Sequence, residues 1–201
     1  MEEFEGDRVR LVHFTDSSAR ADVAAAFDGA GLGLQRGVVE LADASDAWAQ
    51  AFAQVHAVLT ATAPETVAAI EHIGSTSVPG LAAKPILDIA IAVTDGARLD
   101  SLDGWLTGLG MLLRGDSNDV RPDRMYGYEL EPMVRLMNVH VVESSSEGLR
   151  HYLAFRDHLR THHADRDAYG ALKRDLAERH PDDRIAYVDA KASFIVPRRG
   201  H

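Results

Sequence analysis

Residues 70–93 read IEHIGSTSVPGLAAKPILDIAIAV, two apolar runs separated by a segment rich in glycine, serine, threonine and proline. The first run, which begins near residue 67, predicts a strand. The second run, 86–93, is almost continuously apolar and contains β-branched residues, which is typical of a strand buried on both faces. The stretch therefore predicts two strands joined by a polar loop.

The loop between these runs has the composition of an anion site. Gly74 allows the backbone to approach a ligand closely, and consecutive amides in such a turn can form a nest for phosphate oxygens. The hydroxyls of Ser75, Thr76 and Ser77 add donors, and Lys84 adds a positive charge. The same residues are typical of an ordinary turn, so composition alone leaves both interpretations open.

Asp88 lies within the second apolar run, between Leu87 and Ile89. A carboxylate in a buried strand costs free energy unless it is paired or bound to a metal ion. One interpretation is a functional aspartate that binds a metal beside the loop. The other is a structural ion pair with Lys84 or with an arginine.

Composition narrows the classes of function. The 201 residues predict one domain with or without an appendage, and the formal charge of −10 argues against non-specific binding to nucleic acid. A small cavity for one nucleotide is compatible with that charge. The absence of cysteine excludes thiolate zinc sites and cysteine nucleophiles. Without a recognisable signal peptide or an apolar run of about 18 residues, we expect a cytoplasmic protein with no membrane partner.

The chain is expected to have two parts. Residues 1–37 form an N-terminal extension packed on the main body, with a strand at 8–14, a helix capped by Thr15 or Asp16, and a glycine-rich loop. Residues 38–201 form the main domain. It opens with a short strand at 38–41 and a helix capped by Asp43 or Ser45.

Further elements are expected along the main domain. Strands are predicted at 67–73, 86–93, 111–114, 126–130 and 134–143, and helices at 99–109, 147–161, 166–179 and 184–194, with a polar loop at 115–124. This pattern predicts an α+β fold, in which a mixed β-sheet has flanking helices and the C-terminal region is helical.

Several motifs resemble one known family. The segment 70–93 is similar to the signature of the GrpB family, a group within the nucleotidyltransferase superfamily. The resemblance continues through NVHV at 138–141, LAFRDHLR at 153–160, YGALKRDLA at 169–177 and YVDAKASFI at 187–195. It covers about residues 38–195 and implies a nucleotidyltransferase-like fold. The N-terminal extension lies outside it.

The resemblance also implies a site. In the superfamily a Gly-Ser pair holds a triphosphate, a downstream Asp-x-Asp or Asp-x-Glu pair binds divalent metal, and a third carboxylate on another strand completes the site. Gly74 and Ser75 match the pair, and Asp88 matches the first acid. The implied cofactors are ATP or another nucleoside triphosphate and Mg²⁺. The second acid is replaced by Ala90, and one carboxylate holds Mg²⁺ poorly without further ligands.

His140 is the first candidate to replace the missing acid. In the strand 134–143, Asn138, His140 and Val142 share one face, so His140 is expected opposite Asp88 if the two strands are neighbours. It would then act as a metal ligand, a general base or a partner of Asp88. As a ligand it would favour another divalent metal such as zinc, manganese or nickel. The alternative is that His140 is a hydrogen-bonded core histidine. Glu129 and Glu131 rank below His140 as replacements for the missing acid.

The C-terminal helices carry candidate phosphate-binding cations. Arg156 and Arg160 share a helix face, and Lys173 and Lys191 lie on the next two helices. If these helices fold over the sheet, the four cations converge on an anionic ligand. The alternative is a solvated surface with weak ion pairs.

These features predict a nucleotidyltransferase-like enzyme that transfers a nucleotidyl or ATP-activated group to a small-molecule acceptor. Alternatives are an ATP-dependent ligase on the same scaffold, or a non-catalytic nucleotide- or anion-binding module, which the residue Ala90 favours. In a third arrangement the N-terminal extension mediates a homodimer.

Overall fold

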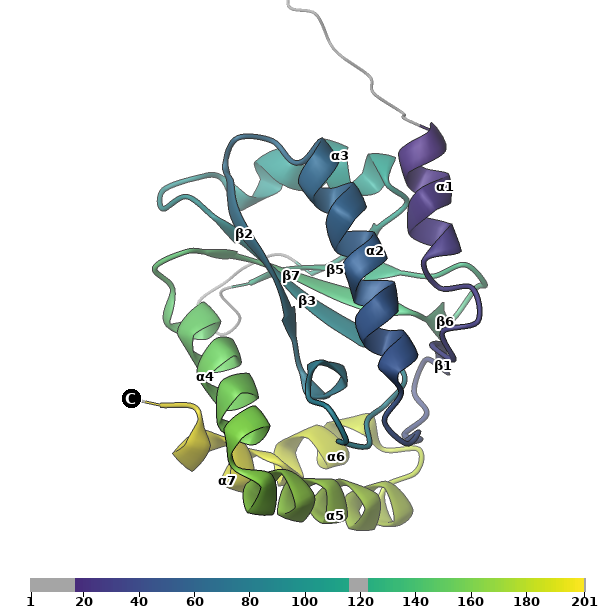
Figure 1. Ribbon diagram of the computed structural model, residues 1–201, viewed down its shortest axis with the longest axis vertical. Coiled ribbons are helices and arrows are strands. Elements are labelled where there is room, and N and C mark those ends of the chain that lie inside the picture. Colours follow the sequence, from purple (N-terminus) through teal and green to yellow (C-terminus); the bar gives the residue numbers. More distant parts are fainter. Residues whose placement is uncertain (1–16, 116–122, 201) are drawn as a thin grey trace, which may run out of the picture.

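The computed structural model describes residues 17–115 and 123–200. The strand expected at 8–14, its helix cap at Thr15 or Asp16, and most of the polar loop at 115–124 lie outside the described residues. A five-stranded mixed sheet has the order β2-β3-β7-β5-β4 (Figure 1). Its strands are β2 (Val67–Ile73), β3 (Leu87–Val93), β4 (Leu112–Gly115), β5 (Arg124–Tyr128) and β7 (Met137–Glu143).

The strand β3 has neighbours on both sides, antiparallel β2 and parallel β7. Six of its seven residues are buried, and only Asp88 is partly exposed. The expectation of a strand buried on both faces is therefore confirmed. In the parallel pair, Asp88 lies opposite Asn138 and Ala90 lies opposite His140.

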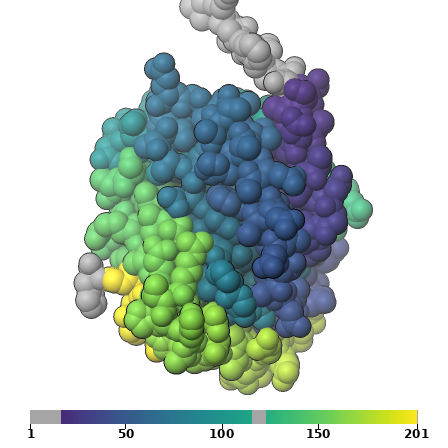
Figure 2. Space-filling view, viewed as in Figure 1, coloured from purple at the N-terminus to yellow at the C-terminus, as the bar shows by residue number. Residues whose placement is uncertain are grey.

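One face of the sheet is covered by α1 (Ser17–Ala25), α2 (Asp46–Thr62), a 3₁₀ turn at Leu99–Leu102 and α3 (Asp103–Gly108). Ile89, Ile91 and Val139 on the sheet belong to one apolar core with Val23 of α1 and Val55 of α2. Figure 2 shows α1 lying against α2 on the surface of the molecule. Residues 17–30 thus share the core of the main domain.

The other face is covered only in part. Helix α4 (Glu147–Thr161) packs Leu149, Tyr152 and Leu153 onto Ala92 and Val142 of the sheet. Helices α5 (His163–Arg179), α6 (Arg184–Ala190) and α7 (Ala192–Ile195), followed by a 3₁₀ turn at Val196–Arg198, close one end of the molecule (Figure 1). The uncovered part of this face forms the floor of a cavity.

The observed elements confirm most of the predicted ones and correct one. Ser45 caps α2 and accepts a hydrogen bond from the amide of Ala47, as expected for one of the two candidate caps. The strand expected at 38–41 is wrong. A short strand instead occupies β1 (Leu34–Gln35), four residues earlier, because these are the residues that pair with β6 (Val134–Arg135).

The predicted α+β class, with its mixed sheet and flanking helices, is confirmed. Among the described residues, no helix is long and apolar enough to cross a membrane.

Candidate functional site

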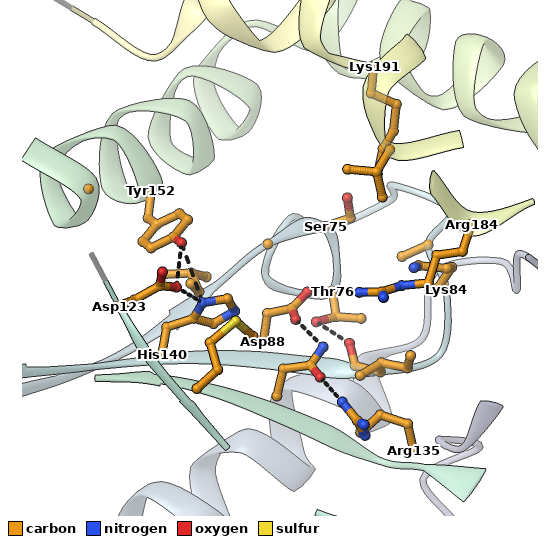
Figure 3. A pocket seen from close by; sticks show the side chains of 18 of the residues that line it. Ser75, Thr76, Lys84, Asp88, Asp123, Arg135, His140, Tyr152, Arg184 and Lys191 are labelled. Atoms are coloured by element: carbon orange, nitrogen blue, oxygen red, sulfur yellow. Dashed lines mark hydrogen bonds and ion pairs between the residues drawn. The ribbon is translucent and has the colours of Figure 1, made fainter. Parts of the chain in front are cut away.

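A cavity of about 710 Å³ opens between the uncovered face of the sheet, the β2–β3 loop and the C-terminal helices (Figure 3). Its most distinctive property is charge. Asp88 and Asp123 are the acidic side chains that line it among the described residues. Its arginines and lysines are Arg36, Lys84, Arg114, Arg135, Lys173, Arg184, Lys191 and Arg199. An acidic chain with charge −10 therefore encloses a cationic cavity, which favours an anionic ligand.

Gly74 and Asp88 are in close contact at the centre of the cavity. Gly74 has φ 68° and ψ −172°, a backbone conformation that is essentially restricted to glycine. A Cβ atom at this position would lie 2.5 Å from Oδ2 of Asp88. Gly74 is thus required both by its backbone angles and by the aspartate beside it.

The hydroxyls that follow Gly74 have different environments. Residues Ser75–Ser77 form a single 3₁₀ turn. Ser75 and Thr76 line the cavity, and Thr76 Oγ1 donates to the carbonyl of Ile86 at 3.4 Å. Ser77 is buried and does not line the cavity, since its Oγ donates to the carbonyl of Gly74 at 2.6 Å. The Thr76 hydroxyl also lies 3.1 Å from His72 Nε2, so of the three hydroxyls that of Ser75 is the most accessible to a ligand.

Asp88 is held by a chain of hydrogen bonds across two strands. Asn138 Nδ2 donates to Asp88 Oδ1 at 2.8 Å, and Arg135 Nη1 donates to Asn138 Oδ1 at 2.6 Å (Figure 3). Neither structural ion pair considered from the sequence forms. Within the described part of the chain, Oδ2 of Asp88 has no hydrogen-bond partner, so one carboxylate oxygen is available to a ligand or a cation.

The position of His140 corrects the sequence-based expectation. The histidine lies opposite Ala90, and Asn138 occupies the place opposite Asp88, because the parallel register is shifted by two residues. His140 Nδ1 is 2.5 Å from Oδ2 of Asp123, and the hydroxyl of Tyr152 donates to the same oxygen at 3.1 Å. The histidine next to the missing second acid is thus bonded to an acid that directly precedes β5.

Asp123 was missed by the sequence analysis, which placed it in a polar loop. It directly precedes β5 and is 5% exposed. Burial raises its pKa, but the hydrogen bonds from His140 and Tyr152 outweigh that effect, and the pKa lies below its usual value. An ionised Asp123 only accepts hydrogen bonds, so His140 Nδ1 is the donor in this pair. Only the register of β5 against β7 brings these residues together.

The C-terminal helices contribute a second group of charges, which we name the Tyr187 cluster: Lys84, Arg184 and Lys191. The ammonium groups of Lys191 and Lys84 lie 4.4 Å and 5.6 Å from the centre of the Tyr187 ring. Burial, followed by the charge of Lys84, lowers the pKa of Lys191 to about 8. Within the described residues, none of the three cations has a carboxylate within ion-pair distance. The positive charge of the Tyr187 cluster is therefore available to an anionic ligand.

Lys173 lies deeper in the same wall. It is 2% exposed, and its ammonium group donates to the carbonyl of Ala82 and lies over the ring of Tyr169. Burial lowers its pKa to about 6, and the charges of Lys191, Arg174 and Lys84 contribute. Lys173 lines the cavity, but its ammonium group already has a partner in the β2–β3 loop.

The predicted cations of α4 are placed elsewhere. Arg156 Nη1 donates to Glu71 Oε2 at 2.7 Å and to the carbonyl of His72 at 3.1 Å. Arg160 donates twice to the carbonyl of Ser77, at 3.1 Å and 2.8 Å. Neither residue lines the cavity. In the structure these arginines attach α4 to β2 and to the loop, so they support the site from behind.

The two glutamates considered as replacement acids are not beside Asp88. Glu129 accepts from Arg114 at 2.6 Å and from Arg135 at 3.2 Å, and Glu131 is exposed. Across residues 17–115 and 123–200, no three His, Asp or Glu side chains are grouped as metal ligands. The described residues therefore do not group into a complete metal site there.

The fold and the cavity define an α+β protein whose cavity is lined by positively charged side chains. Comparison with known proteins gives its family. A family model described as GrpB protein matches residues 38–197. The chain belongs to the GrpB family, which confirms the resemblance to that family seen in the sequence.

Known relatives are bacterial. The chain is 44% identical to a UPF0157 protein of Streptomyces coelicolor, over 63% of this chain and 64% of that one. It is 28% identical to the glutamate-rich protein GrpB of Alkalihalophilus pseudofirmus, over 82% and 95% of the two chains. A crystal structure of conserved protein GrpB from Enterococcus faecalis matches with a TM-score of 0.70 and 32% identity, over 80% of this chain and 94% of that one. The matched region spans slightly less than two thirds of the Streptomyces relative.

Proposed function

We propose that the chain is a nucleotidyltransferase-like enzyme that transfers a nucleotidyl or ATP-activated group to a small-molecule acceptor. The observation that carries the proposal is the cationic cavity around Gly74, Ser75 and Asp88 in a protein of charge −10. Its volume of about 710 Å³ lies in the range of cavities that bind small molecules and cofactors.

The triphosphate would lie between the β2–β3 loop and the Tyr187 cluster. Ser75 places a hydroxyl on one side, and Lys84 and Lys191 offer positive charge on the other. Because the two lysines rest on the ring of Tyr187, their positions are fixed before the ligand arrives. Such preorganised charge stabilises the transition state of phosphoryl transfer at little reorganisation cost.

Asp88 fits one mode of Mg²⁺ binding. Mg²⁺ is commonly held by one or two carboxylates together with substrate phosphates and water, and Asp88 has one oxygen available for this. The ion would neutralise negative charge on the phosphates. Asp123 is occupied by His140 and Tyr152, so the residues do not fit the two-metal arrangement of the wider superfamily.

His140 has the surroundings of a general base. Asp123 accepts a hydrogen bond from His140 Nδ1, which orients the ring. Nε2 would then take the proton from the hydroxyl group of the acceptor molecule as that hydroxyl attacks. The acceptor oxygen would form a bond to the α-phosphorus, the bond from that phosphorus to the bridging oxygen would break, and pyrophosphate would leave. Asp123 and Tyr152 position the histidine and stabilise the imidazolium ion that this step produces.

Calorimetry of the full chain with α,β-methylene-ATP tests the nucleotide site. We expect the analogue to bind, and Mg²⁺ to tighten binding about tenfold, an effect of one charge-assisted contact. Asp88→Asn should keep the fold and lose the Mg²⁺ effect. Asp22→Asn, an exposed change on α1, is the matched control. A wild-type chain that does not bind the analogue would refute the proposal.

A non-catalytic binding module is the second candidate, because Ala90 stands where the second acid is expected and no complete metal site is grouped in the described residues. Incubation of α-labelled ATP with a metabolite extract separates the two. Labelled product that disappears in Asp88→Asn and His140→Ala supports the transferase. Binding of the analogue that is unaffected by Mg²⁺ and by Asp88→Asn, with no labelled product, supports the module.

A further inference from the structure

The N-terminal segment reaches the cavity although it lies outside the family match. The amide of Gly33 donates to the carbonyl of Pro85 at 2.8 Å, which attaches the segment to the end of the β2–β3 loop. Strand β1 then pairs with β6, and the amide of Arg36 donates to the carbonyl of Met133 at 2.8 Å. Arg36, which precedes the matched residues 38–197, lines the cavity as a result.

Arg36 joins two other arginines there, and we name Arg36, Arg114 and Arg135 the arginine cluster. All three line the cavity. Burial lowers the pKa of Arg135, Glu129 opposes this effect, and the nearby charges of Arg114 and Arg36 lower it further. Arg114 and Arg36 thus both act on the charge of Arg135.

The cluster has more positive charge than its acid neutralises. Arg114 and Arg135 both donate to the same oxygen of Glu129, Oε1. The exposed Arg36 has no carboxylate partner among the described residues, and Nε of Arg114 is a buried donor without an acceptor. Guanidinium groups stay protonated, so the cluster has positive charge in excess of Glu129 that is available to a further anion.

Arg135 of the cluster is closely packed and is linked to Asp88. A Cβ atom on Gly127 of β5 would lie 2.8 Å from Cζ of Arg135, so the glycine makes room for the guanidinium group across the strand. Arg135 donates to Asn138, which donates to Asp88. Arg135 therefore lies two hydrogen bonds from Asp88, the carboxylate assigned to the triphosphate side.

We propose that the arginine cluster is a second anion subsite, completed by the N-terminal segment through Arg36, which binds a carboxylate or phosphate group of the acceptor. Guanidinium groups bind both oxyanions in bidentate geometry. The Tyr187 cluster, formed by other elements, remains for the nucleotide. The inference deepens the proposed function and rests on it, because it assigns an anionic class to the acceptor.

The test titrates two small anions, malonate and inorganic phosphate, into the full chain saturated with α,β-methylene-ATP and Mg²⁺. Arg36→Gln removes one charge of the cluster, and Lys191→Gln removes one charge of the nucleotide side. Arg179→Gln is the matched control, since Arg179 is exposed on α5, pairs with Asp175 and does not line the cavity.

We expect at least one anion to bind, and Arg36→Gln to weaken it about tenfold, the effect of one charge-assisted hydrogen bond, while the nucleotide affinity is unchanged. Lys191→Gln should weaken binding of the nucleotide analogue and leave the affinity for the anion unchanged. Arg179→Gln should change neither affinity. Preference for malonate identifies a carboxylate acceptor, and preference for phosphate identifies a phosphorylated one.

The inference is overturned if neither anion binds, if Arg36→Gln matches Arg179→Gln, or if Lys191→Gln weakens both ligands equally, which would indicate a single site. Failure of the proposed function is a separate outcome, seen as no binding of the nucleotide analogue. In that case the same anion titrations without nucleotide still compare Arg36→Gln with Arg179→Gln.

Discussion

Gly74 is the residue on which the geometry of the site depends most directly. Its backbone angles belong to glycine, and the side chain of Asp88 lies where a Cβ atom would be. The loop can therefore lie against the aspartate only because residue 74 has no side chain. This close approach brings the donors of the loop and the carboxylate of Asp88 to the same side of the cavity.

A pair of glycine substitutions tests this dependence. Gly31 also has a positive φ, of 63°, but nothing lies within 4 Å of its Cβ position. We expect Gly31→Ala to lower the free energy of unfolding by about 1 kcal/mol and Gly74→Ala by about 3 kcal/mol, because only the second adds a steric clash to backbone strain. Urea denaturation measures both. Equal losses would show that Asp88 moves away at no cost.

At the scale of elements, helix α5 is attached to the β2–β3 loop by one buried side chain. Lys173 donates to the carbonyl of Ala82, and the loop residues Val78 and Leu81 pack with Tyr169 of the same helix. The attachment fixes the loop together with Leu159 of α4, which belongs to the same apolar cluster. Its strength depends on pH, because burial lowers the pKa of Lys173 to about 6.

The free energy of unfolding should therefore depend on pH with a definite sign, which can be measured. Between pH 6 and about 10.5 the unfolded chain holds a proton on Lys173 that the folded chain has released, so folding becomes more favourable as the pH rises. The free energy of unfolding of the wild type relative to Lys173→Met should increase by up to about 1.4 kcal/mol per pH unit. Denaturation of both proteins at pH 6, 7, 8 and 9 measures the slope. A flat difference would contradict the lowered pKa.

The elements themselves were largely predictable from the sequence. The strands β2 and β3 and the helix α4 follow from apolar periodicity and caps, since these signals are local. The register of β7 against β3 was not predictable. A shift of β7 by two residues along β3 leaves the same side chains on the same face of the sheet, so the alternating pattern fits either register. Asp123 was missed because its partner lies 17 residues away on a different strand.

At the scale of the whole molecule, charge is segregated between the surface and the cavity. The chain has 31 acidic and 21 basic Lys and Arg residues, yet basic residues dominate the cavity lining. Several of these, such as Arg36 and Arg184, gave no local signal in the sequence, because they come from elements far apart in the chain. An acidic exterior with a basic interior surface is selective for small anions that fit inside.

Tripolyphosphate is a simple probe of this segregation. At a concentration about 100 times its dissociation constant, a ligand of the folded state stabilises by about 2.7 kcal/mol, or about 5–10 °C for a chain of this size. We expect such a rise in Tm at pH 7, measured by scanning calorimetry. The rise should shrink at pH 9, because Lys191, with a pKa of about 8, has lost its proton.

The matched control is sodium chloride at the same ionic strength, which should not stabilise the protein. If tripolyphosphate and sodium chloride act alike, the cavity does not bind a phosphate chain. Lys191→Gln should reduce the tripolyphosphate effect, and an undiminished effect would move the phosphate site away from the Tyr187 cluster.

The hydrogen bonds of the cavity join residues that are far apart along the chain, and this has a consequence for folding. Asp88 and Asn138 are 50 residues apart, and Ala82 and Lys173 are 91 apart. Parallel pairing across such separations closes long loops and is slow to form. The cavity is therefore among the last features to assemble, and no short fragment of the chain contains it. Ligand binding would report the arrival of the complete native state.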